Sequence, residues 1–119
     1  MSYDLSGDGT AFATGLNNPI GLGIDGNDLL VAENGADRVM SIPLNGGPPI
    51  VFKILTGPVG LDSRNISGIG FIAYLTNGAS VLKVQAGQPD VDIDPGDGSR
   101  SAAATFGGNV FVTTDAGTL

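Results

Sequence analysis

Glycine is spread so evenly along this 119-residue chain that it limits the length of any helix. The 20 glycines leave no glycine-free stretch longer than residues 36–45, and that stretch contains Pro43. Helices in globular proteins average about 11–12 residues, and an interior glycine costs about 1 kcal/mol relative to alanine. The glycines follow no Gly-X-Y period, which excludes a collagen helix. We therefore expect an all-β protein built from short strands and turns.

Short motifs recur along the chain with a period of about 40 residues. Pro-Ile-Gly-Leu at 19–22 returns as Pro-Val-Gly-Leu at 58–61, and Asn-Gly-Ala at 34–36 returns at 77–79. A period of about 40–45 residues made of short strands is typical of a β-propeller, in which each repeat forms one four-stranded blade. The repeats therefore predict about three such blades for this chain.

Each repeat divides into strands separated by turn residues. The first strand of the first repeat contains Gly21 and Gly23, which suit a crowded inner position where two backbones approach closely. Residues 62–65 are polar, and we expect them to form an insertion loop between two strands; the alternative is a polar site at a channel mouth. We predict strands at 20–24, 29–32, 38–42 and 50–55, and again at 59–62, 70–74, 81–84 and 91–93.

The two ends of the chain match complementary halves of one further blade. Residues 2–5 and 10–14 match the third and fourth strands of a repeat, and 101–106 and 109–114 match the first and second. The predicted division is a half blade at 1–14, blades at 15–56 and 57–95, and a half blade at 96–119. Propellers have about 4–8 blades, and an open stack leaves sheet edges exposed. We therefore expect a homodimer that closes one six-bladed ring; an excised fragment or a small sandwich is the alternative.

The first repeat resembles the NHL-type propeller repeat. The resemblance rests on Gly-Leu-Asn-Asn-Pro-Ile-Gly-Leu-Gly-Ile-Asp at 15–25 and Leu-Leu-Val-Ala-Glu-Asn-Gly-Ala-Asp-Arg-Val at 29–39. The following Ile-Pro-Leu-Asn-Gly is close to the end of a YWTD-type repeat, and gluconolactonase/regucalcin-like six-bladed propellers share this style. The match is good over 15–47, weaker over 57–85 and faint over 101–119. It implies a propeller fold and selects no function, because such folds host receptors, scaffolds and enzymes.

Polar residues end or follow the second strand of each repeat. They are Glu33, Asn34, Asn77 and Asp115. In the lactonase-like propellers that the first repeat resembles, oxygen ligands near the central channel hold a divalent metal, and such oxygens suit calcium or magnesium. We therefore treat these four residues as candidate ligand-binding groups at a channel rim. The alternative is that they cap the tight turn into the third strand.

The densest acidic run contains Asp90, Asp92, Asp94 and Asp97. Alternate carboxylates can converge on calcium, so these four are candidate metal ligands. The EF-hand pattern is not met, because Pro95 stands where that loop needs glycine. The alternative is that the aspartates line the solvent face of an outer strand, with Val91 and Ile93 facing inward. We expect no cofactor beyond an adventitious or structural calcium.

Charge and composition exclude several classes of function. Five basic residues against twelve acidic ones give a net charge of −7, which disfavours nucleic acid and anionic membranes as partners. The absence of histidine and cysteine excludes a Ser-His-Asp triad and a thiolate nucleophile. We see neither a signal peptide nor an apolar run of the roughly 20 residues that span a bilayer, so we expect a soluble protein of unknown compartment.

The sequence therefore favours a non-enzymatic binding module over an enzyme. We expect it to close into a ring with a second copy and to present loops to a protein, peptide or glycan partner. The alternative that the resemblance implies is a divalent-metal-dependent lactonase or hydrolase. In that case Glu33, Asn34 and Asn77 would lie near a cation that polarises a carbonyl.

Overall fold

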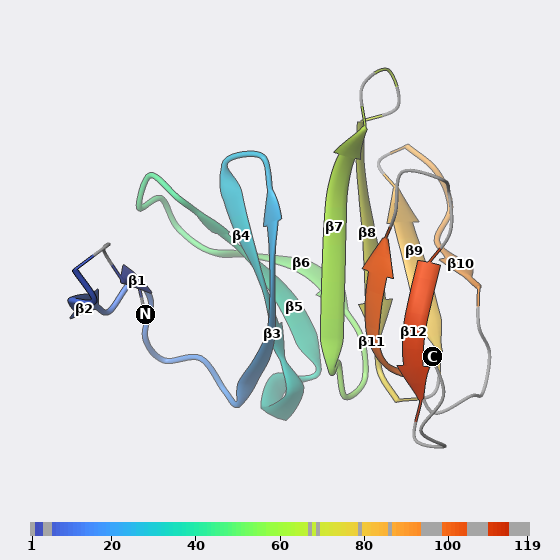
Figure 1. Cartoon of the computed structure of the whole chain (residues 1–119), viewed down its shortest axis with the longest axis horizontal. Helices are drawn as coiled ribbons and strands as arrows, with labels where there is room; N and C mark the ends of the chain where they lie inside the picture. Colours follow the sequence, from blue (N-terminus) through green and yellow to red (C-terminus); the bar gives the residue numbers. More distant parts are fainter. Residues whose placement is uncertain are drawn as a thin grey trace.

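The structure is a computed structural model that describes residues 2–3, 6–66, 68, 70–78, 80–85, 87–93, 99–104 and 110–114. Within these residues the chain forms two four-stranded antiparallel sheets and two hairpins (Figure 1). The first sheet consists of β3 (Pro19–Asp25), β4 (Asp28–Glu33), β5 (Arg38–Pro43) and β6 (Ile50–Ile54). The second consists of β7 (Gly60–Ile66), β8 (Gly70–Thr76), β9 (Val81–Gln85) and β10 (Val91–Asp92).

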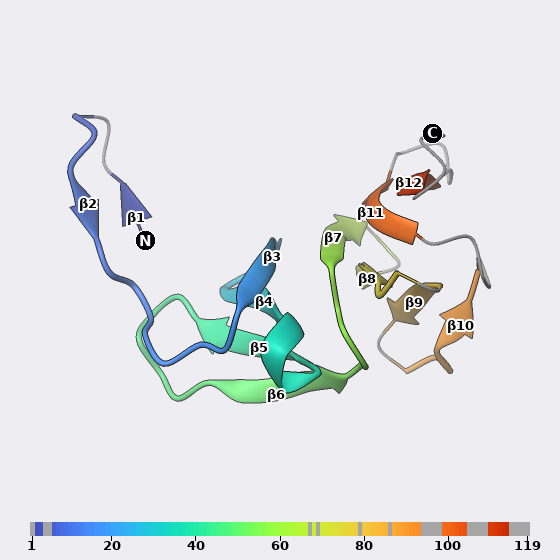
Figure 2. The same ribbon diagram turned by 90° about the horizontal axis from the view of Figure 1, so that it is seen from below.

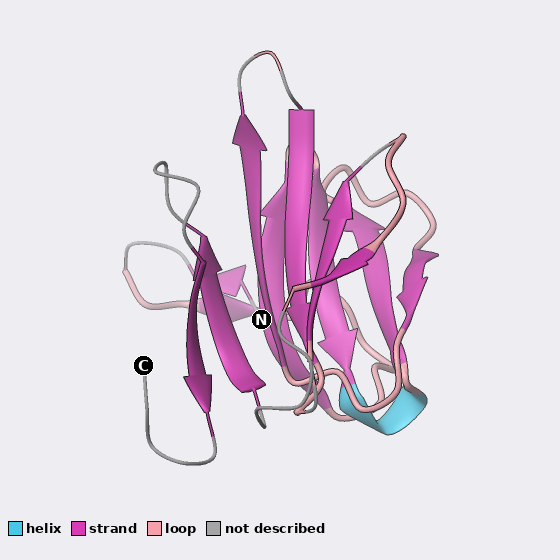
Figure 3. Cartoon of the chain, turned by 90° about the vertical axis from the view of Figure 1, so that its right-hand side faces the viewer, coloured by secondary structure: helices cyan, strands magenta, loops and turns pink. Residues whose placement is uncertain are grey.

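The hairpins lie on either side of these sheets in the chain. They are formed by β1 (Ser2–Tyr3) with β2 (Gly9–Thr10), and by β11 (Ser99–Ala104) with β12 (Val110–Thr114). A 3-10 turn, η1 (Asn34–Ala36), joins β4 to β5 at one end of the first sheet (Figure 3). No helix of the described residues has the length and apolarity that crossing a membrane requires.

The sheets fan out like the blades of a propeller. Each four-stranded sheet is an up-and-down meander in which neighbours in sequence are neighbours in space. The first strand of the first sheet, β3, packs against β7, and β7 and β8 pack against β11. Figure 2 shows β3, β7 and β11 side by side, with β6 and β10 at the outer margin. The predicted all-β fold of propeller type is therefore confirmed.

Two glycines of β3 allow the neighbouring sheets to approach this closely. A Cβ on Gly21 would lie 3.2 Å from the carbonyl oxygen of Val59, and a Cβ on Gly23 would collide with the side chain of Leu61. The Ser63 hydroxyl also donates a hydrogen bond across the gap to the carbonyl oxygen of Ile24. The crowded position predicted for these glycines is thus the packing surface between β3 and β7.

The main core lies between the two sheets. Leu30, Ala32 and Val39 of the first sheet pack there against residues of the second, among them Ala73 and Leu75. The rings of Phe52 and Phe71 add an edge-to-face contact with centroids 6.0 Å apart. This layer of apolar side chains fixes how one sheet sits on the next.

Two predicted strand boundaries were wrong. Residues 62–65 form no insertion loop; they continue β7, paired with β8 from Asp62 opposite Tyr74 to Asn65 opposite Phe71. Backbone hydrogen bonds to the apolar strand β8 hold this polar segment in the sheet. Such pairing cannot be inferred from the composition of the segment itself. Residues 11–14 form no strand, because the β1–β2 pairing ends at Thr10 opposite Ser2. The sheets lie within 15–56 and 57–95, and the exact blade boundaries stay predictions.

Candidate functional site

A buried carboxylate lies at the turn between β4 and β5. Glu33 ends β4 with none of its surface exposed. Arg38 begins β5 directly opposite and donates from Nε to Glu33 Oε2 over 2.6 Å. The backbone N–H of Asn17 donates to Glu33 Oε1 over 2.8 Å. Charged hydrogen bonds of this kind offset the cost of removing the carboxylate from water.

These contacts also determine how Glu33 titrates. The hydrogen bond from Arg38 is the main reason that the pKa of the Glu33 carboxyl lies below its ordinary value, and the Asn17 N–H adds to the effect against the opposing influence of burial. The same bond raises the pKa of Arg38. A general acid or base works best with a pKa near the working pH, and here the pKa moves away from neutrality. Glu33 is therefore suited to holding the turn in place rather than to proton transfer.

Asn34 connects three segments of chain at the same turn. Its amide Nδ2 donates to the carbonyl oxygen of Pro58 over 3.1 Å, and its Oδ1 accepts from Asn18 Nδ2 over 3.4 Å. Its backbone N–H donates to the carbonyl oxygen of Asn18 over 3.1 Å. One side chain thus ties the segment before β3 and the β4–β5 turn to the linker that leads into β7.

The second repeat uses Thr76 and Asn77 in a similar way. Thr76 is fully buried at the end of β8, and its Oγ1 accepts from the backbone N–H of Gly60 over 3.0 Å. Asn77 Oδ1 accepts from the backbone N–H of Ser80 over 3.0 Å, which caps the turn into β9. The backbone N–H of Val59 donates to the carbonyl oxygen of Thr76 over 2.8 Å. The structure therefore brings Asn34 and Thr76 to one linker at residues 58–60, while Asn77 bonds within its own turn and Asp115 lies outside the described residues.

Asp37 is a residue of this site that we did not single out from the sequence. It adopts a left-handed conformation with φ 52°, and its Oδ1 accepts from the backbone N–H of Gly57 over 2.8 Å. Its own carbonyl oxygen accepts from the backbone N–H of Leu55 over 3.1 Å. Aspartate tolerates the left-handed conformation and is favoured in turns. The position of Asp37 between two predicted strands was therefore the sequence signal for its role in this turn.

The predicted acidic cluster is only partly within the described residues. Asp90 forms an ion pair with Lys53 of β6, which joins the outer margins of the two sheets. Asp92 is exposed, and Asp94 and Asp97 lie outside the described residues. In the part of the chain that the structure describes, no group of three or more acidic side chains is gathered as a metal site would require.

The expectation that the apolar residues of this run face inward was wrong. Val91 is 49% exposed and Ile93 is 42% exposed. Val91 belongs to β10, which is two residues long and the outermost strand of its sheet, and Ile93 directly follows this strand, so both side chains lie at the sheet margin. Alternation of polar and apolar residues predicts a buried face only where a second layer exists.

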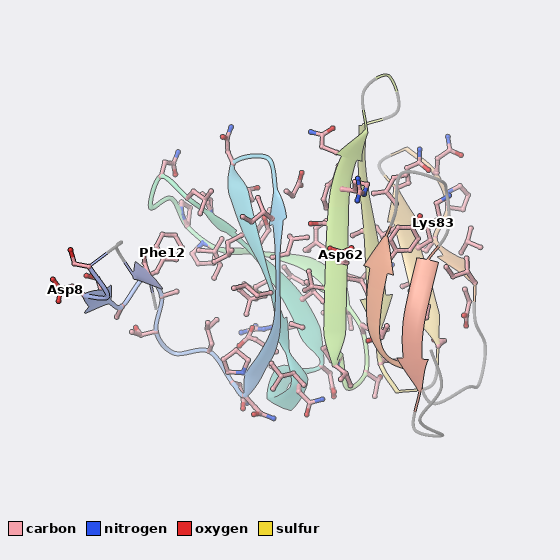
Figure 4. The ribbon with its side chains drawn as sticks, viewed as in Figure 1. Asp8, Phe12, Asp62 and Lys83 are labelled. Atoms are coloured by element: carbon pink, nitrogen blue, oxygen red, sulfur yellow. The ribbon has the colours of Figure 1, made fainter. Side chains whose placement is uncertain are left out.

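An apolar groove opens on the other face of the first sheet. It has a volume of about 530 Å³ and lies between strand β3 and an N-terminal side formed by Ser2, Phe12, Ala13 and Leu16. Phe12 lines it beside the β1–β2 hairpin (Figure 4), and Ile20 and Leu22 line it from β3. Its floor is formed by Leu29, Val31 and Ile42. We call this feature the β3 groove.

The β4–β5 and β8–β9 turns, which we call the polar end, differ in chemical character from the β3 groove. Asp62 of β7 and Lys83 of β9 lie on the second sheet, apart from the β3 groove (Figure 4). Among the described residues, no buried polar side-chain atom at any site lacks a hydrogen-bond partner. The polar groups at this end are therefore bonded to one another or to backbone, whereas the β3 groove exposes apolar side chains.

Comparison with known proteins agrees with the architecture. No family model and no curated protein matches the sequence. The structure is similar to a solved structure of streptogramin B lyase, which is a β-propeller protein, with a TM-score of 0.62 and 13% sequence identity. The similarity covers 90% of this chain and 41% of that chain. The chain thus has the fold of part of a β-propeller and spans less than half the length of this structural neighbour.

Proposed function

We propose that this chain is a non-enzymatic binding module that forms a closed propeller ring with a second copy of itself. The observation that carries the proposal is the packing of β3, β7 and β11 side by side as innermost strands, with the β3 groove left open beside them. Sheets arranged in this way around a common axis leave an exposed edge or face until the ring closes. A chain that matches 41% of a propeller protein supplies a little under half of such a ring.

The end of the ring that carries the β4–β5 and β8–β9 turns is our proposed binding face. Asn34 and Asn77 lie there at corresponding positions of the two repeats, both partly exposed. The Glu33–Arg38 pair and Asp37 hold the backbone of this end in one conformation. A rigid end of this kind suits recognition of a protein, peptide or glycan, because little conformational freedom is lost on binding.

A lactonase or hydrolase that works through a divalent cation is the less favoured alternative. It would need the oxygens of Glu33, Asn34 and Asn77 to converge on the ion, but Glu33 is bonded to Arg38, and Asn34 and Asn77 already bond to neighbouring chain. Calcium titration by calorimetry together with a lactone-turnover assay separates the two. Micromolar calcium binding with turnover would support the enzyme, and the absence of both would support the binding module.

The mass of the 119-residue chain in solution tests the proposal. One chain has a mass of 11.9 kDa, and we expect light scattering on a sizing column to give twice that mass over a range of concentrations. A monomer at every concentration would overturn the ring. Peptide and glycan arrays probed with the wild-type chain and with Asn34→Ala, Asn77→Ala then test whether bound ligands use the proposed end.

A further inference from the structure

The recurring Pro-x-Gly-Leu motif has opposite surroundings in the two repeats. Pro58 and Leu61 of the second repeat are buried, and Leu61 is only 9% exposed. The equivalent residues of the first repeat, Pro19 and Leu22, are exposed, and Leu22 is 63% exposed. Corresponding residues of a repeat are expected to pack alike, so the first repeat lacks, among the described residues, a neighbour that the second repeat has.

The neighbour of Leu61 is an inner strand. Leu61 lies where a Cβ on Gly23 of β3 would stand, and it belongs to the core between the two sheets. Leu22 therefore needs a further inner strand on the open side of β3. Among the described strands, β3, β7 and β11 occupy inner positions. Because β7 lies between β3 and β11, neither of these inner strands covers the Leu22 side of β3.

The exposed apolar residues agree with a missing neighbour at this position. Ile20 and Ile24 alternate with the glycines of β3 and are 48% and 59% exposed. Phe12 and Leu44, which line the β3 groove, are 37% and 46% exposed. Contiguous exposed apolar surface of this kind marks a protein interaction site more often than a surface that stays in water.

The number of strands in each sheet indicates which segment could lie between β1 and β3. Each complete sheet has two inner and two outer strands, whereas each hairpin has only two strands. By comparison, the β1–β2 hairpin lacks the two inner strands and the β11–β12 hairpin lacks the two outer strands. Insertion of a β11–β12 hairpin beside β1 gives the order β11-β12-β1-β2, which has the same number of strands as the two complete sheets. The sequence of β11, Ser-Arg-Ser-Ala-Ala-Ala, is rich in small residues, as inner strand β3 is rich in glycine.

We propose that the β3 groove is the docking site for the β11–β12 hairpin of a second copy of this chain. The hairpin covers Ile20, Leu22 and Ile24, and its β12 edge pairs with β1, so that each copy completes one blade of the other. This inference rests on the proposed ring and specifies which surfaces close it. By two-fold symmetry the same contact forms twice.

A charge placed in the groove tests the docking site. Leu22→Asp puts a carboxylate where the hairpin docks, and we expect the dimer dissociation constant to rise about 100-fold. Ile54→Asp is the matched control, because Ile54 is 69% exposed on the outer strand β6, away from the groove. Both side chains are exposed within one copy, so circular dichroism should show folded protein for both variants. A dimer of Leu22→Asp with wild-type affinity would overturn the docking site.

Cross-linking then identifies the occupant of the groove. Phe12 is replaced by p-benzoylphenylalanine, and isotopically labelled and unlabelled chains are mixed before illumination. We expect cross-links between labelled and unlabelled chains that map to residues 99–114. A dimer whose cross-links map elsewhere would overturn this inference and leave the proposed ring standing. A monomer in the light-scattering experiment would overturn the ring itself, so the two failures are distinguishable.

Discussion

Glu33 and Arg38 stand opposite each other across the β4–β5 ladder, and Arg38 Nε lies 2.6 Å from Glu33 Oε2. This pair makes stability depend on pH. The pKa of Glu33 is lower in the folded chain than in the unfolded one, so its ionised form favours folding. The contribution is present above the unfolded pKa of about 4.3 and is lost as the pH falls through the lower folded value.

We predict that Glu33→Gln lowers the free energy of unfolding at pH 7 by about 1–3 kcal/mol, because the buried acceptor of Arg38 and Asn17 loses its charge. Urea titrations at fixed protein concentration from pH 7 down to pH 3 measure this. The variant should also lose less stability than the wild type as the pH falls below about 4.3. Asp8→Asn in the exposed β1–β2 turn is the control. Parallel pH profiles for Glu33→Gln and the wild type would contradict the prediction.

The turn between β3 and β4 contains an unfavourable pair of like charges. Asp25 stands opposite Asp28 across this two-residue turn. Burial, and then the charge of Asp28, raise the pKa of Asp25 above its ordinary value. A raised pKa means that ionised Asp25 opposes folding at neutral pH. The opposition disappears as the pH falls through the folded pKa and is absent below the unfolded value of about 3.9.

We therefore predict that Asp25→Asn stabilises the fold by about 0.5 kcal/mol at pH 7, measured by urea denaturation. At pH 3 the gain should vanish. Asp28→Asn is the matched comparison: it removes the same repulsion but weakens the bond that Asp28 Oδ2 accepts from Ser41 Oγ over 3.1 Å. Its gain should be smaller. A gain from Asp25→Asn that persists at pH 3 would show that charge is not the cause.

Local signals in the sequence predicted the fold well because each acts over a few residues. Gly21 and Gly23 predicted a crowded inner strand, and the repeated Pro-x-Gly-Leu motif indicated where each sheet begins. The secondary structure of polar segments was harder to predict. Residues 62–65 belong to β7 because β8 pairs with them, and that pairing partner is invisible to a reading of composition alone.

The candidate site was less predictable because its contacts join distant segments. Glu33 and Asn34 were singled out at the right turn, but their partners Asn17 and Pro58 are 16 and 24 residues away in sequence. The β3 groove has no sequence signal of its own. Leu22 looks the same as Leu61 in the repeat, and only the structure shows that one is covered and the other is not.

Packing between β3 and β7 gives a third prediction. Gly23→Ala adds a Cβ that collides with the flexible end of the Leu61 side chain, whereas Gly21→Ala meets the backbone oxygen of Val59 at 3.2 Å. We expect each substitution to cost about 1–3 kcal/mol in the free energy of unfolding. The two costs should respond differently to a second change, because a side chain can be trimmed and a backbone oxygen cannot.

A double-mutant cycle with Leu61→Ala measures this difference. The added cost of Gly23→Ala should nearly disappear in the Leu61→Ala background, and that of Gly21→Ala should not change. Leu61→Ala alone costs about 2–5 kcal/mol, so the cycle is measured by urea titration at low temperature. Additive effects for Gly23→Ala and Leu61→Ala would contradict the collision.

The ion pair between Lys53 and Asp90 gives the last prediction, which also tests the acidic run as a calcium site. The two side chains are 31% and 29% exposed, so Lys53→Gln should cost less than about 1 kcal/mol, and 1 M salt should remove the difference. With Asp90 engaged by Lys53, millimolar calcium should leave the melting temperature of the wild type unchanged beyond the effect of magnesium.

The Lys53→Gln variant removes the partner of the Asp90 carboxylate. Any calcium binding by Asp90 and Asp92 should therefore appear first in this variant, and Asp90→Asn is its control. A calcium-specific rise of several degrees in the wild type that Asp90→Asn abolishes would show that Asp90 is a metal ligand, because a ligand that binds only the folded chain raises its stability.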